Sequence, residues 1–306
     1  MAEASPGYEV MLRDIGASHP SVIVIDAGLA TSMKTKLFEE RFPDRYFNLG
    51  IAEQNAVSVA SGLARRGLIP LVHTFSNFIV RRAHDQVALS VAWPGCNVKF
   101  IAGSCGLFDG RNGPSHLAID DLAAMMALPG VAVVEPGDQR QTRELLSWML
   151  AHDGPVYFRL RRHGVPSDLL PELDSSIGTI MVQRHEQSPC TLVACGSMLE
   201  EAQLASQMLL DDGIPIDLIH VSILRPLDSE PIISSTTRTH LVVTLENHVA
   251  CGALGDAVAR VVGPMGVRHF RLSLPDEFLP AGDPPWQLAY CGLDAVSLVD
   301  QIKTLL

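Results

Sequence analysis

Apolar runs rich in β-branched residues alternate with helix-like segments along most of the chain, and this alternation constrains the fold more than any other feature. The run Ser21–Asp26 is continuously apolar until the Asp that closes it, which is typical of a strand buried on both faces, and Val98–Ala102 is predicted as a further strand. Amphipathic segments such as Gln139–His152 lie between these runs. The succession of strands and helices predicts an α/β fold with two doubly wound domains, each built on a mainly parallel sheet.

A polar segment that contains prolines divides the chain into two parts. The chain has 306 residues, and domains usually have about 100 to 200. We therefore predict a first domain over 1–165, a linker over 166–189 with a short strand at Thr179–Val182, and a second domain over 190–306. Hydrophobic residues make up 47% of the sequence, enough apolar material for two cores.

The composition argues against several classes of function. The formal net charge is −11, whereas a nucleic-acid-binding face has to be basic. No apolar stretch is long enough to cross a membrane, and the first residues lack the pattern of a signal peptide. The six cysteines are scattered without a CxxC pair, so we expect reduced thiols in a cytoplasmic protein and no zinc site.

Three stretches carry residues suited to chemistry. Asn48–Asn55 contains Glu53 at the start of a predicted helix that is rich in Ala, Ser and Gly. His73–Arg81 contains two phenylalanines, and Gly113–His116 ends a long glycine-rich loop that begins at Gly103. Each stretch also has an ordinary structural explanation: an acid stabilises a helix start, a Phe pair packs in a core, and a loop His bonds to the backbone. The long loop itself is a candidate site, as is Ala27–Thr35 after the first strand.

Taken together, in this order, the three motifs resemble the pyrimidine-binding region of thiamine-diphosphate (ThDP) enzymes, in particular transketolase and deoxyxylulose-phosphate synthase. The turn Arg225–Asp228 and Glu246 at a strand end are similar to the smaller C-terminal domain of transketolases. The resemblance covers nearly the whole chain but only the C-terminal half of a full transketolase. It implies a pyrimidine-binding domain followed by a transketolase C-terminal domain.

The resemblance also implies roles for individual residues. Glu53 matches the family's glutamate, which hydrogen-bonds N1′ of the aminopyrimidine and activates the cofactor. Phe75 and Phe78 match aromatic residues that pack on the pyrimidine. Arg81 falls where transketolase has a third aromatic residue and deoxyxylulose-phosphate synthase has an Arg. His116 is expected to exchange protons with substrate oxygens.

The substrate positions depart from the family pattern. Ser104 and Asn112 stand where transketolase has a His and an Asp that contact the sugar, so the substrate is expected to differ from standard ketose phosphates or the pocket to be more open. Ser32 and Arg162 match residues that hold a distal phosphate, with Arg161 or Arg159 as alternatives to Arg162. The family's second phosphate-binding Arg has no counterpart near the start of the chain.

The resemblance implies a partner as well. No Gly-Asp-Gly motif for the diphosphate and Mg²⁺ occurs in the sequence, so an N-terminal transketolase subunit has to supply that half of the cofactor site, and a heterotetramer is expected. This chain would hold no metal itself. The predicted function is transfer of a two-carbon ketol unit from a ketose, or its phosphate, to an acceptor. The alternatives are a 2-oxo-acid dehydrogenase β-like subunit that passes an acyl unit to a lipoyl or carrier-protein thiol, and a non-catalytic assembly partner.

Overall fold

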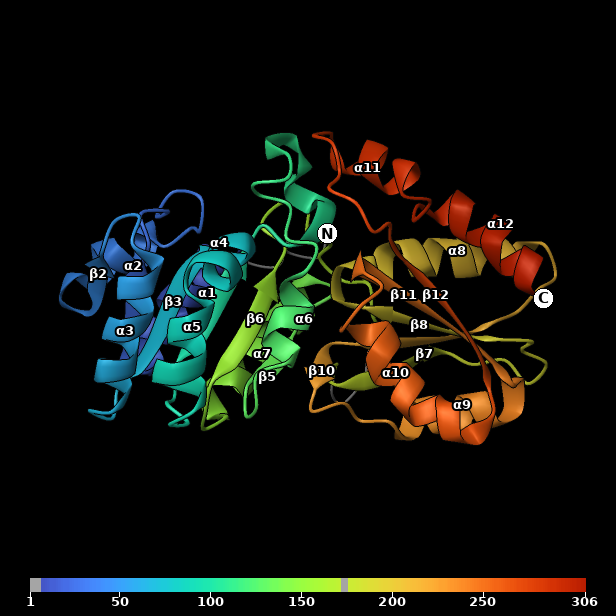
Figure 1. The fold of residues 1–306 in the computed structure, drawn as a ribbon, viewed down its shortest axis with the longest axis horizontal. Helices are drawn as coiled ribbons and strands as arrows, with labels where there is room; N and C mark the ends of the chain where they lie inside the picture. The colour runs from blue at the N-terminus through green and yellow to red at the C-terminus, as the bar shows by residue number, and fades with distance from the viewer. Residues whose placement is uncertain (1–6, 172–175) are drawn as a thin grey trace.

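Two α/β lobes lie side by side in the computed structural model, which describes residues 7–171 and 176–306 (Figure 1). A seven-stranded sheet forms the first lobe, in the order β10-β5-β6-β4-β3-β1-β2. A five-stranded sheet forms the second, in the order β12-β11-β8-β9-β7. Within both sheets only the edge pairs β10–β5 and β7–β9 are antiparallel, which confirms the predicted α/β class with two mainly parallel sheets.

The first lobe is built from the N-terminal part of the chain. Its own strands are β1 (Val22–Asp26), β2 (Tyr46–Asn48), β3 (Ile69–Phe75), β4 (Lys99–Gly103), β5 (Ala132–Val134) and β6 (Val156–Leu160). Its helices are α1 (Tyr8–Ser18), α2 (Lys36–Arg41), α3 (Glu53–Ala64), α4 (Ser76–Arg82), α5 (His84–Gln86), α6 (Asp121–Met126) and α7 (Gln139–Ala151). Shorter helical segments are η1 (Pro43–Arg45), η2 (Val87–Ala92) and η3 (Gly106–Asn112).

The C-terminal part of the chain supplies the second lobe. Its strands are β7 (Thr179–Gln183), β8 (Thr191–Cys195), β9 (Asp217–Val221), β11 (Leu241–Val249) and β12 (Arg268–Leu274), while β10 (Ile223–Arg225) crosses to the first sheet. Its helices are α8 (Leu199–Asp211), α9 (Glu230–Thr239), α10 (Leu254–Val262), α11 (Pro284–Tyr290) and α12 (Ala295–Leu305), with short turns η4 (Gly196–Met198) and η5 (Gly263–Met265).

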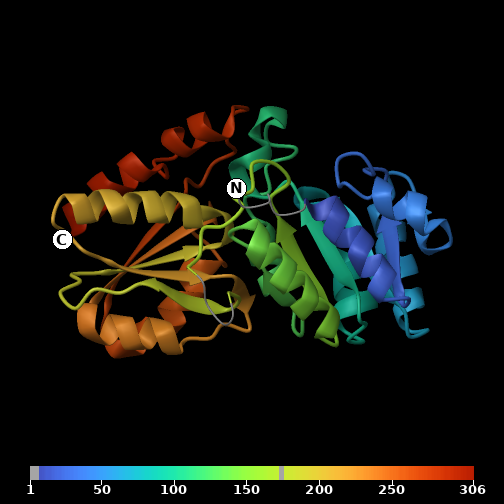
Figure 2. The same ribbon diagram turned by 180° about the vertical axis from the view of Figure 1, so that it is seen from behind.

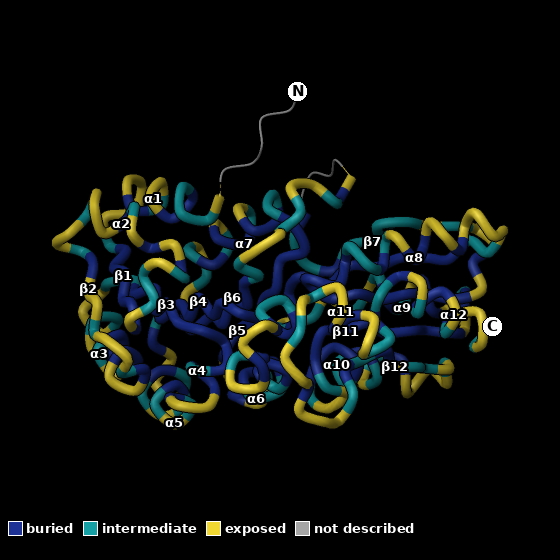
Figure 3. The backbone as a smooth tube through the Cα atoms, turned by 90° about the horizontal axis from the view of Figure 1, so that it is seen from above, coloured by how far each residue is buried: buried dark blue, intermediate teal, exposed yellow. Residues whose placement is uncertain are grey.

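The continuous apolar runs are explained by the burial of both faces of the central strands. Successive side chains of a strand point to opposite faces. In β1, Val22 and Val24 pack in the core beneath α1 and α7, whereas Ile23 and Ile25 pack in the core beneath α3 and α4. Figure 2 shows α1 and α7 on the face that is turned away in Figure 1. Figure 3 shows the buried backbone concentrated along the two sheets, with exposed residues at the helix surfaces and loop tips.

Two segments cross the expected domain boundary. Strand β7 lies in the stretch predicted to be linker, yet it pairs antiparallel with β9 and so completes the second sheet. Strand β10 comes from the second half of the chain, yet Ile223 pairs with Val134 of β5 in the first sheet. The lobes are therefore joined by backbone hydrogen bonds as well as by side-chain packing.

Several elements differ from their predicted extent. The helix expected over 77–92 is broken at Ala83, whose backbone is not helical (φ −130°, ψ 13°), so α4 ends at Arg82. Strand β2, α11 and α12 were not predicted. In the described parts of the chain no helix is long and apolar enough to cross a membrane. All six cysteines are free, and Cys96, Cys105, Cys190 and Cys195 are buried.

Candidate active site

The predicted functional residues follow the carboxyl ends of the parallel strands in the first lobe. Ser32 lies in the loop after β1, Phe78 follows β3, and Arg162 follows β6. The loop that carries His116 follows β4. Carboxyl ends of parallel strands meet at one edge of a sheet, where open α/β folds place ligands. The fold thus brings together residues that are more than a hundred positions apart in the sequence.

An aromatic cluster forms the centre of this edge. The rings of Phe75 and Phe78 lie 5.3 Å apart between centroids, and His116 meets both edge-on, at 5.7 and 5.2 Å. Phe75 is buried and Phe78 partly so. The spacing of three residues brings both rings together because Phe75 ends β3 while Phe78 lies in the first turn of α4.

Glu53 begins α3 and is only 4% exposed. Its Oε1 accepts a hydrogen bond from Nη1 of Arg82 at 2.7 Å. The guanidinium carbon of Arg82 also lies 3.8 Å from the centroid of the Phe78 ring. Arg82 therefore connects the buried carboxylate to the aromatic cluster through an ion pair and a cation–π contact.

His116 is held by its neighbour in the loop. The distance between its Nδ1 and the Ser115 hydroxyl oxygen is 2.8 Å, so Nε2 is left for another partner. Desolvation lowers the pKa of His116 below its ordinary value, and the positive charges of Arg162 and Arg82 act in the same direction, whereas Asp109 opposes them. The imidazole is consequently neutral at neutral pH.

Arg162 links the cluster to the loop after β1. It lies above Phe75, with 4.5 Å from its guanidinium carbon to the ring centroid, and its Nη1 donates to the Ser32 carbonyl at 3.1 Å. Its Nε and Nη2 donate to the two carboxylate oxygens of Asp109 at 2.9 and 2.7 Å. Gly103 permits this arrangement, because a Cβ there would lie 2.9 Å from Cδ of Arg162.

Buried polar contacts fix the loop after β1. Asp26, the last residue of β1, accepts hydrogen bonds from the Leu29 amide at 2.6 Å and the Thr35 hydroxyl at 2.9 Å. Burial raises the pKa of Asp26, and these hydrogen bonds counteract the shift. The loop that carries Ser32 and Lys34 is thereby anchored at both ends.

Other predicted residues lie outside the central cluster. Ser104 is buried at 1% exposure in a left-handed backbone conformation (φ 61°), and its hydroxyl has no hydrogen-bond partner within residues 7–171 and 176–306. Asn112 is exposed and lines a neighbouring cavity of about 480 Å³. Arg81 pairs with Asp120 at 3.0 Å.

Arg159 and Arg161 were the predicted alternatives to Arg162 as ligands of a phosphate. Arg159 is fully buried. Its guanidinium donates to Asp121, to Glu135 and to the carbonyls of Ala118 and Asn247, and it does not line the cavity beside Arg162. Arg161 donates to Glu200 at 3.1 Å and lies 3.9 Å from the centroid of the Phe108 ring. Arg162 is the residue of this group that joins the aromatic cluster.

Sequence reasoning missed three charged residues of this region, namely Arg82, Asp109 and Lys34. Arg81 and Arg82 are adjacent, and successive helical side chains point about 100° apart, so the helical phase decides which one faces Glu53. Phe78 lies four residues before Arg82 on the same face of α4, and this spacing was the available signal. Asp109 and Lys34 carry no comparable signal, because their positions depend on loop conformation.

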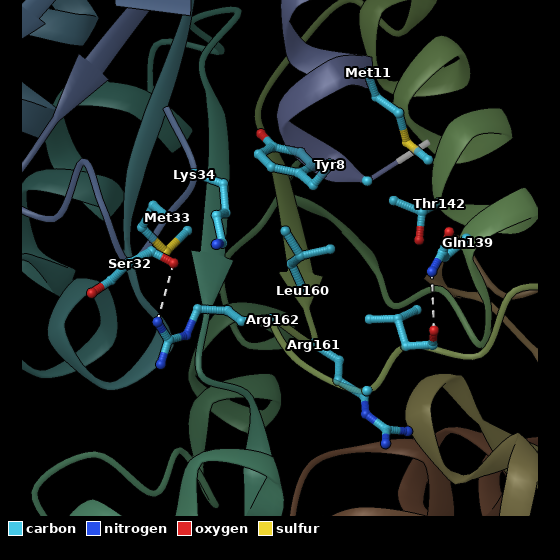
Figure 4. A pocket seen from close by; sticks show the side chains of 13 residues that line it. Tyr8, Met11, Ser32, Met33, Lys34, Gln139, Thr142, Leu160, Arg161 and Arg162 are labelled. Atoms are coloured by element: carbon cyan, nitrogen blue, oxygen red, sulfur yellow. Dashed lines mark hydrogen bonds between the residues drawn. The ribbon is translucent and has the colours of Figure 1, made fainter. Parts of the chain in front are cut away.

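A cavity of about 360 Å³ opens beside Arg162. Ser32, Lys34 and Tyr8 line it on one side, and Gln139 and Thr142 at the start of α7 line it on the other (Figure 4). Its contact with Arg162 places it next to the aromatic cluster.

Comparison with known families agrees with the fold. Residues 4–167 match the transketolase pyrimidine binding domain, and residues 178–298 match the transketolase C-terminal domain. The fold and the sequence together define a protein built from a transketolase-type pyrimidine-binding domain and a transketolase-type C-terminal domain. This chain belongs to the transketolase family and comprises those two domains.

Individual relatives support the assignment. A 6-deoxy-6-sulfo-D-fructose transketolase subunit of Clostridium sp. is 36% identical over 95% of this chain and 91% of its own length. A 1-deoxy-D-xylulose-5-phosphate synthase of Geobacter sulfurreducens is 32% identical over 96% of this chain, which spans 47% of that protein. A solved structure described as a split gene transketolase, inactive β4 tetramer, is 36% identical, with a TM-score of 0.86 over 97% of this chain and 95% of that one.

Proposed function

We propose that this chain is the catalytic pyrimidine-binding subunit of a ThDP-dependent enzyme that transfers a two-carbon ketol unit from a ketose, or its phosphate, to an acceptor. The observation that carries the proposal is the convergence of a buried carboxylate, an aromatic pair and a neutral imidazole at one sheet edge. Glu53, Phe78 and His116 come from separate elements, and ordinary core packing has no need for this combination.

The residues present fit the aminopyrimidine half of ThDP. A flat heteroaromatic ring can stack on Phe75 and Phe78, while Glu53 offers a carboxylate oxygen to a ring nitrogen. Two further oxygen atoms in neighbouring residues are available for hydrogen bonds. The buried Asn77 Oδ1 and Thr74 Oγ1 have no hydrogen-bond partner in the described part of the chain. Bound ThDP supplies the carbon nucleophile that the side chains of this protein lack.

In this proposal Glu53 holds a proton between its carboxylate and the pyrimidine nitrogen. His116 acts on the substrate. Because its imidazole is neutral at neutral pH, Nε2 can accept a proton from a substrate hydroxyl and return it as the carbonyl and hydroxyl forms exchange. The Ser115 hydroxyl at Nδ1 orients the ring for this exchange. The proposal also assigns Arg81 to the cofactor site and Asn112 to the substrate site.

The proposal includes an N-terminal transketolase subunit that carries the diphosphate and Mg²⁺ site, in a heterotetramer with this chain. Support comes from the sequence, which has no Gly-Asp-Gly motif, and from the exposed face of α3. Ser58 and Gly62 are exposed there, and no atom lies within 4 Å of a Cβ placed at Gly62. Small side chains on the helix that begins with Glu53 allow a second subunit to approach the cofactor closely.

The test is calorimetric titration of ThDP with Mg²⁺ into this chain, first alone and then mixed with its candidate N-terminal partner. Tight binding only in the mixture is expected. Glu53→Gln should retain cofactor binding within about tenfold but lower kcat about 100-fold or more, because an amide cannot exchange the proton. Glu40→Gln, which changes an exposed acid on α2, is the matched control. Unchanged turnover in Glu53→Gln would favour the assembly-partner alternative.

A further inference from the structure

The loop that carries His116 packs into the second lobe, although it follows a strand of the first. Leu107, at the start of η3, and Leu117, next to His116, are 0% and 1% exposed, and both lie in the apolar core of the second lobe with Leu279 and Leu288. Figures 1 and 2 both show α11 beside the green loop that contains η3. The His116 loop is therefore held on both sides by the core of the other lobe.

Asn247 of β11 forms a polar anchor at the first turn of η3. It is 2% exposed, and its Oδ1 accepts a hydrogen bond from the Leu107 amide at 3.1 Å. Its Nδ2 donates to the Ser197 hydroxyl at 3.5 Å. Gly106 makes room for this side chain, because its backbone is left-handed (φ 53°) and a Cβ there would overlap the Asn247 carboxamide. The start of η3 is thus shaped to receive one side chain of the second lobe.

Gln287 of α11 forms a second anchor, at Gly110 in the middle of η3. It is 1% exposed, and its Nε2 donates to the Pro280 carbonyl at 2.8 Å. Its Oε1 lies so close to Gly110 that a Cβ at this glycine would overlap it. That oxygen has no hydrogen-bond partner in the described parts of the chain, and a buried acceptor without a partner is unfavourable. Gln287 therefore contacts the loop by close packing, which the missing side chain of Gly110 permits.

A short series of backbone hydrogen bonds connects this second anchor to His116. The Gly110 carbonyl accepts from the amide of Gly282, in the second lobe, at 3.1 Å and from the amide of Gly113 at 3.0 Å. The Gly113 carbonyl in turn accepts from the amide of His116 at 2.9 Å. The imidazole meets the Phe78 ring edge-on, with 5.2 Å between centroids. A displacement of Gly110 is therefore passed on to the position of the imidazole against the aromatic cluster.

We propose that Gln287 and Asn247 are positioning residues for His116, so that the second lobe sets the geometry of the reaction centre through the loop. This inference rests on the proposed function, in which His116 exchanges protons with the substrate. A catalytic base has to lie within hydrogen-bond reach of the proton that it accepts. A loop shift of about 1 Å is therefore expected to lower the turnover number strongly, while the cofactor contacts of Glu53 and Phe75 stay in place.

The first experiment is a double-mutant cycle in the assembled enzyme. Gly110→Ala should lower kcat about 10- to 100-fold and change KM less than about threefold, because the new methyl group meets Gln287 and displaces the loop. Gln287→Ala removes the anchor and should lower kcat about tenfold. In the Gln287→Ala background, Gly110→Ala should have almost no further effect, because the space is then vacant.

The matched control is Gly263→Ala, at a glycine where a Cβ would have no neighbour within 4 Å, and it should leave kcat unchanged. Gln287→Met, which fills a similar volume against Gly110, should retain kcat within about threefold of the wild type. Effects of Gly110→Ala and Gln287→Ala that simply multiply, or an unchanged kcat in both single variants, would overturn the proposal.

NMR of the ligand-free full chain separates this inference from the proposed function. The His116 ring signals, identified by their absence in His116→Gln, report on the edge-on contacts with the phenylalanine rings. In Gly110→Ala and in Asn247→Ala these signals should move, and the pKa of His116 should rise toward its ordinary value as the ring becomes better solvated. In Gly263→Ala they should match the wild type. Shifted His116 signals in a chain without ketol transfer would remove the proposed function alone, whereas unshifted signals would remove the roles of Gln287 and Asn247.

Discussion

At the scale of single residues, the pairing of Glu53 with Arg82 is the most informative contact in the site. The carboxylate is 5% exposed and the guanidinium 45% exposed, so the pair spans the boundary between core and solvent. A buried carboxylate without a partner is costly. Arg82 supplies that partner at the start of α3.

We expect Arg82→Ala to lower the free energy of unfolding by about 1–2 kcal/mol, between the values typical of exposed and of buried ion pairs. The same change made in a Glu53→Gln background should cost much less, since the buried charge is already absent. Urea unfolding of the four proteins in this double-mutant cycle measures the coupling. Additive effects would show that Arg82 stabilises the protein through Phe78 and not through Glu53.

The positions of single residues in the candidate site were predictable where a short sequence motif defines them. The positions of Glu53, Phe75, Phe78 and His116 follow from short stretches of sequence that stay contiguous in space. Arg82 depends on helical phase, and Asp109 on how η3 folds against the end of β6. Pairings between segments far apart in the chain are set by tertiary packing, and a single sequence does not contain a local signal for them.

At the scale of elements, a partly buried hydrogen bond connects α1 to β3. The Tyr8 hydroxyl lies 2.6 Å from Nε2 of His73, and Nδ1 of His73 lies 3.1 Å from the Leu71 carbonyl oxygen. Burial lowers the pKa of His73 to about 4, so the ring stays neutral in the folded protein. Tyr8 also lines the cavity that contains Lys34, so this bond helps to set the shape of the substrate pocket.

The lowered pKa predicts a pH dependence of stability. Between pH 6.5 and about 4 the unfolded chain binds a proton at His73 that the folded chain does not, so the free energy of unfolding falls as the pH falls through this window. The contribution of His73 amounts to about 3 kcal/mol over the full window. His73→Asn should be less stable at pH 7 but lose less stability on acidification, as measured by urea unfolding at pH 7, 6 and 5. A slope as steep as that of the wild type, or as that of the exposed-residue control His19→Gln, would contradict this account.

Whether a segment forms a helix or a strand was more predictable than where that element ends and which strand it pairs with. Buried parallel strands such as β1 and β6 are recognisable because both faces are apolar. The break at Ala83 and strand β10 were not predicted, since a three-residue strand has almost no periodicity of its own and is defined by its neighbour β5. The short strand predicted at Thr179–Val182 corresponds to β7, but its pairing with β9 depends on tertiary packing, and it was therefore placed in the linker.

At the scale of the whole molecule, a buried charge network joins the two lobes. Arg159 of β6 donates to both carboxylate oxygens of Asp121 and to Oε2 of Glu135 at 2.8 to 3.0 Å. It also donates to the Asn247 carbonyl, in the second lobe, at 3.0 Å. Glu135 in turn accepts hydrogen bonds from the amide and hydroxyl of Ser197. The network fixes how one sheet sits against the other.

We expect Arg159→Met to destabilise the protein by about 3–5 kcal/mol, because two buried carboxylates lose their common cation. The lobes should also unfold less cooperatively, giving a broadened or double transition in scanning calorimetry. Arg65→Met, at an exposed position at the end of α3, is the control and should leave a single transition near the wild-type temperature. A single unshifted transition in Arg159→Met would exclude this network as the coupling element.

The crossing of β10 into the first sheet determines where the chain can be divided. A fragment that ends after β6 would contain every predicted cofactor-contacting residue, yet it would lack Ile223–Arg225 and leave the backbone groups of β5 unpaired along an open sheet edge. Open edges of this kind recruit strands from other molecules. Any engineered exchange of domains between relatives would therefore have to transfer β10 together with the sheet it completes, even though the sequence places it in the other domain.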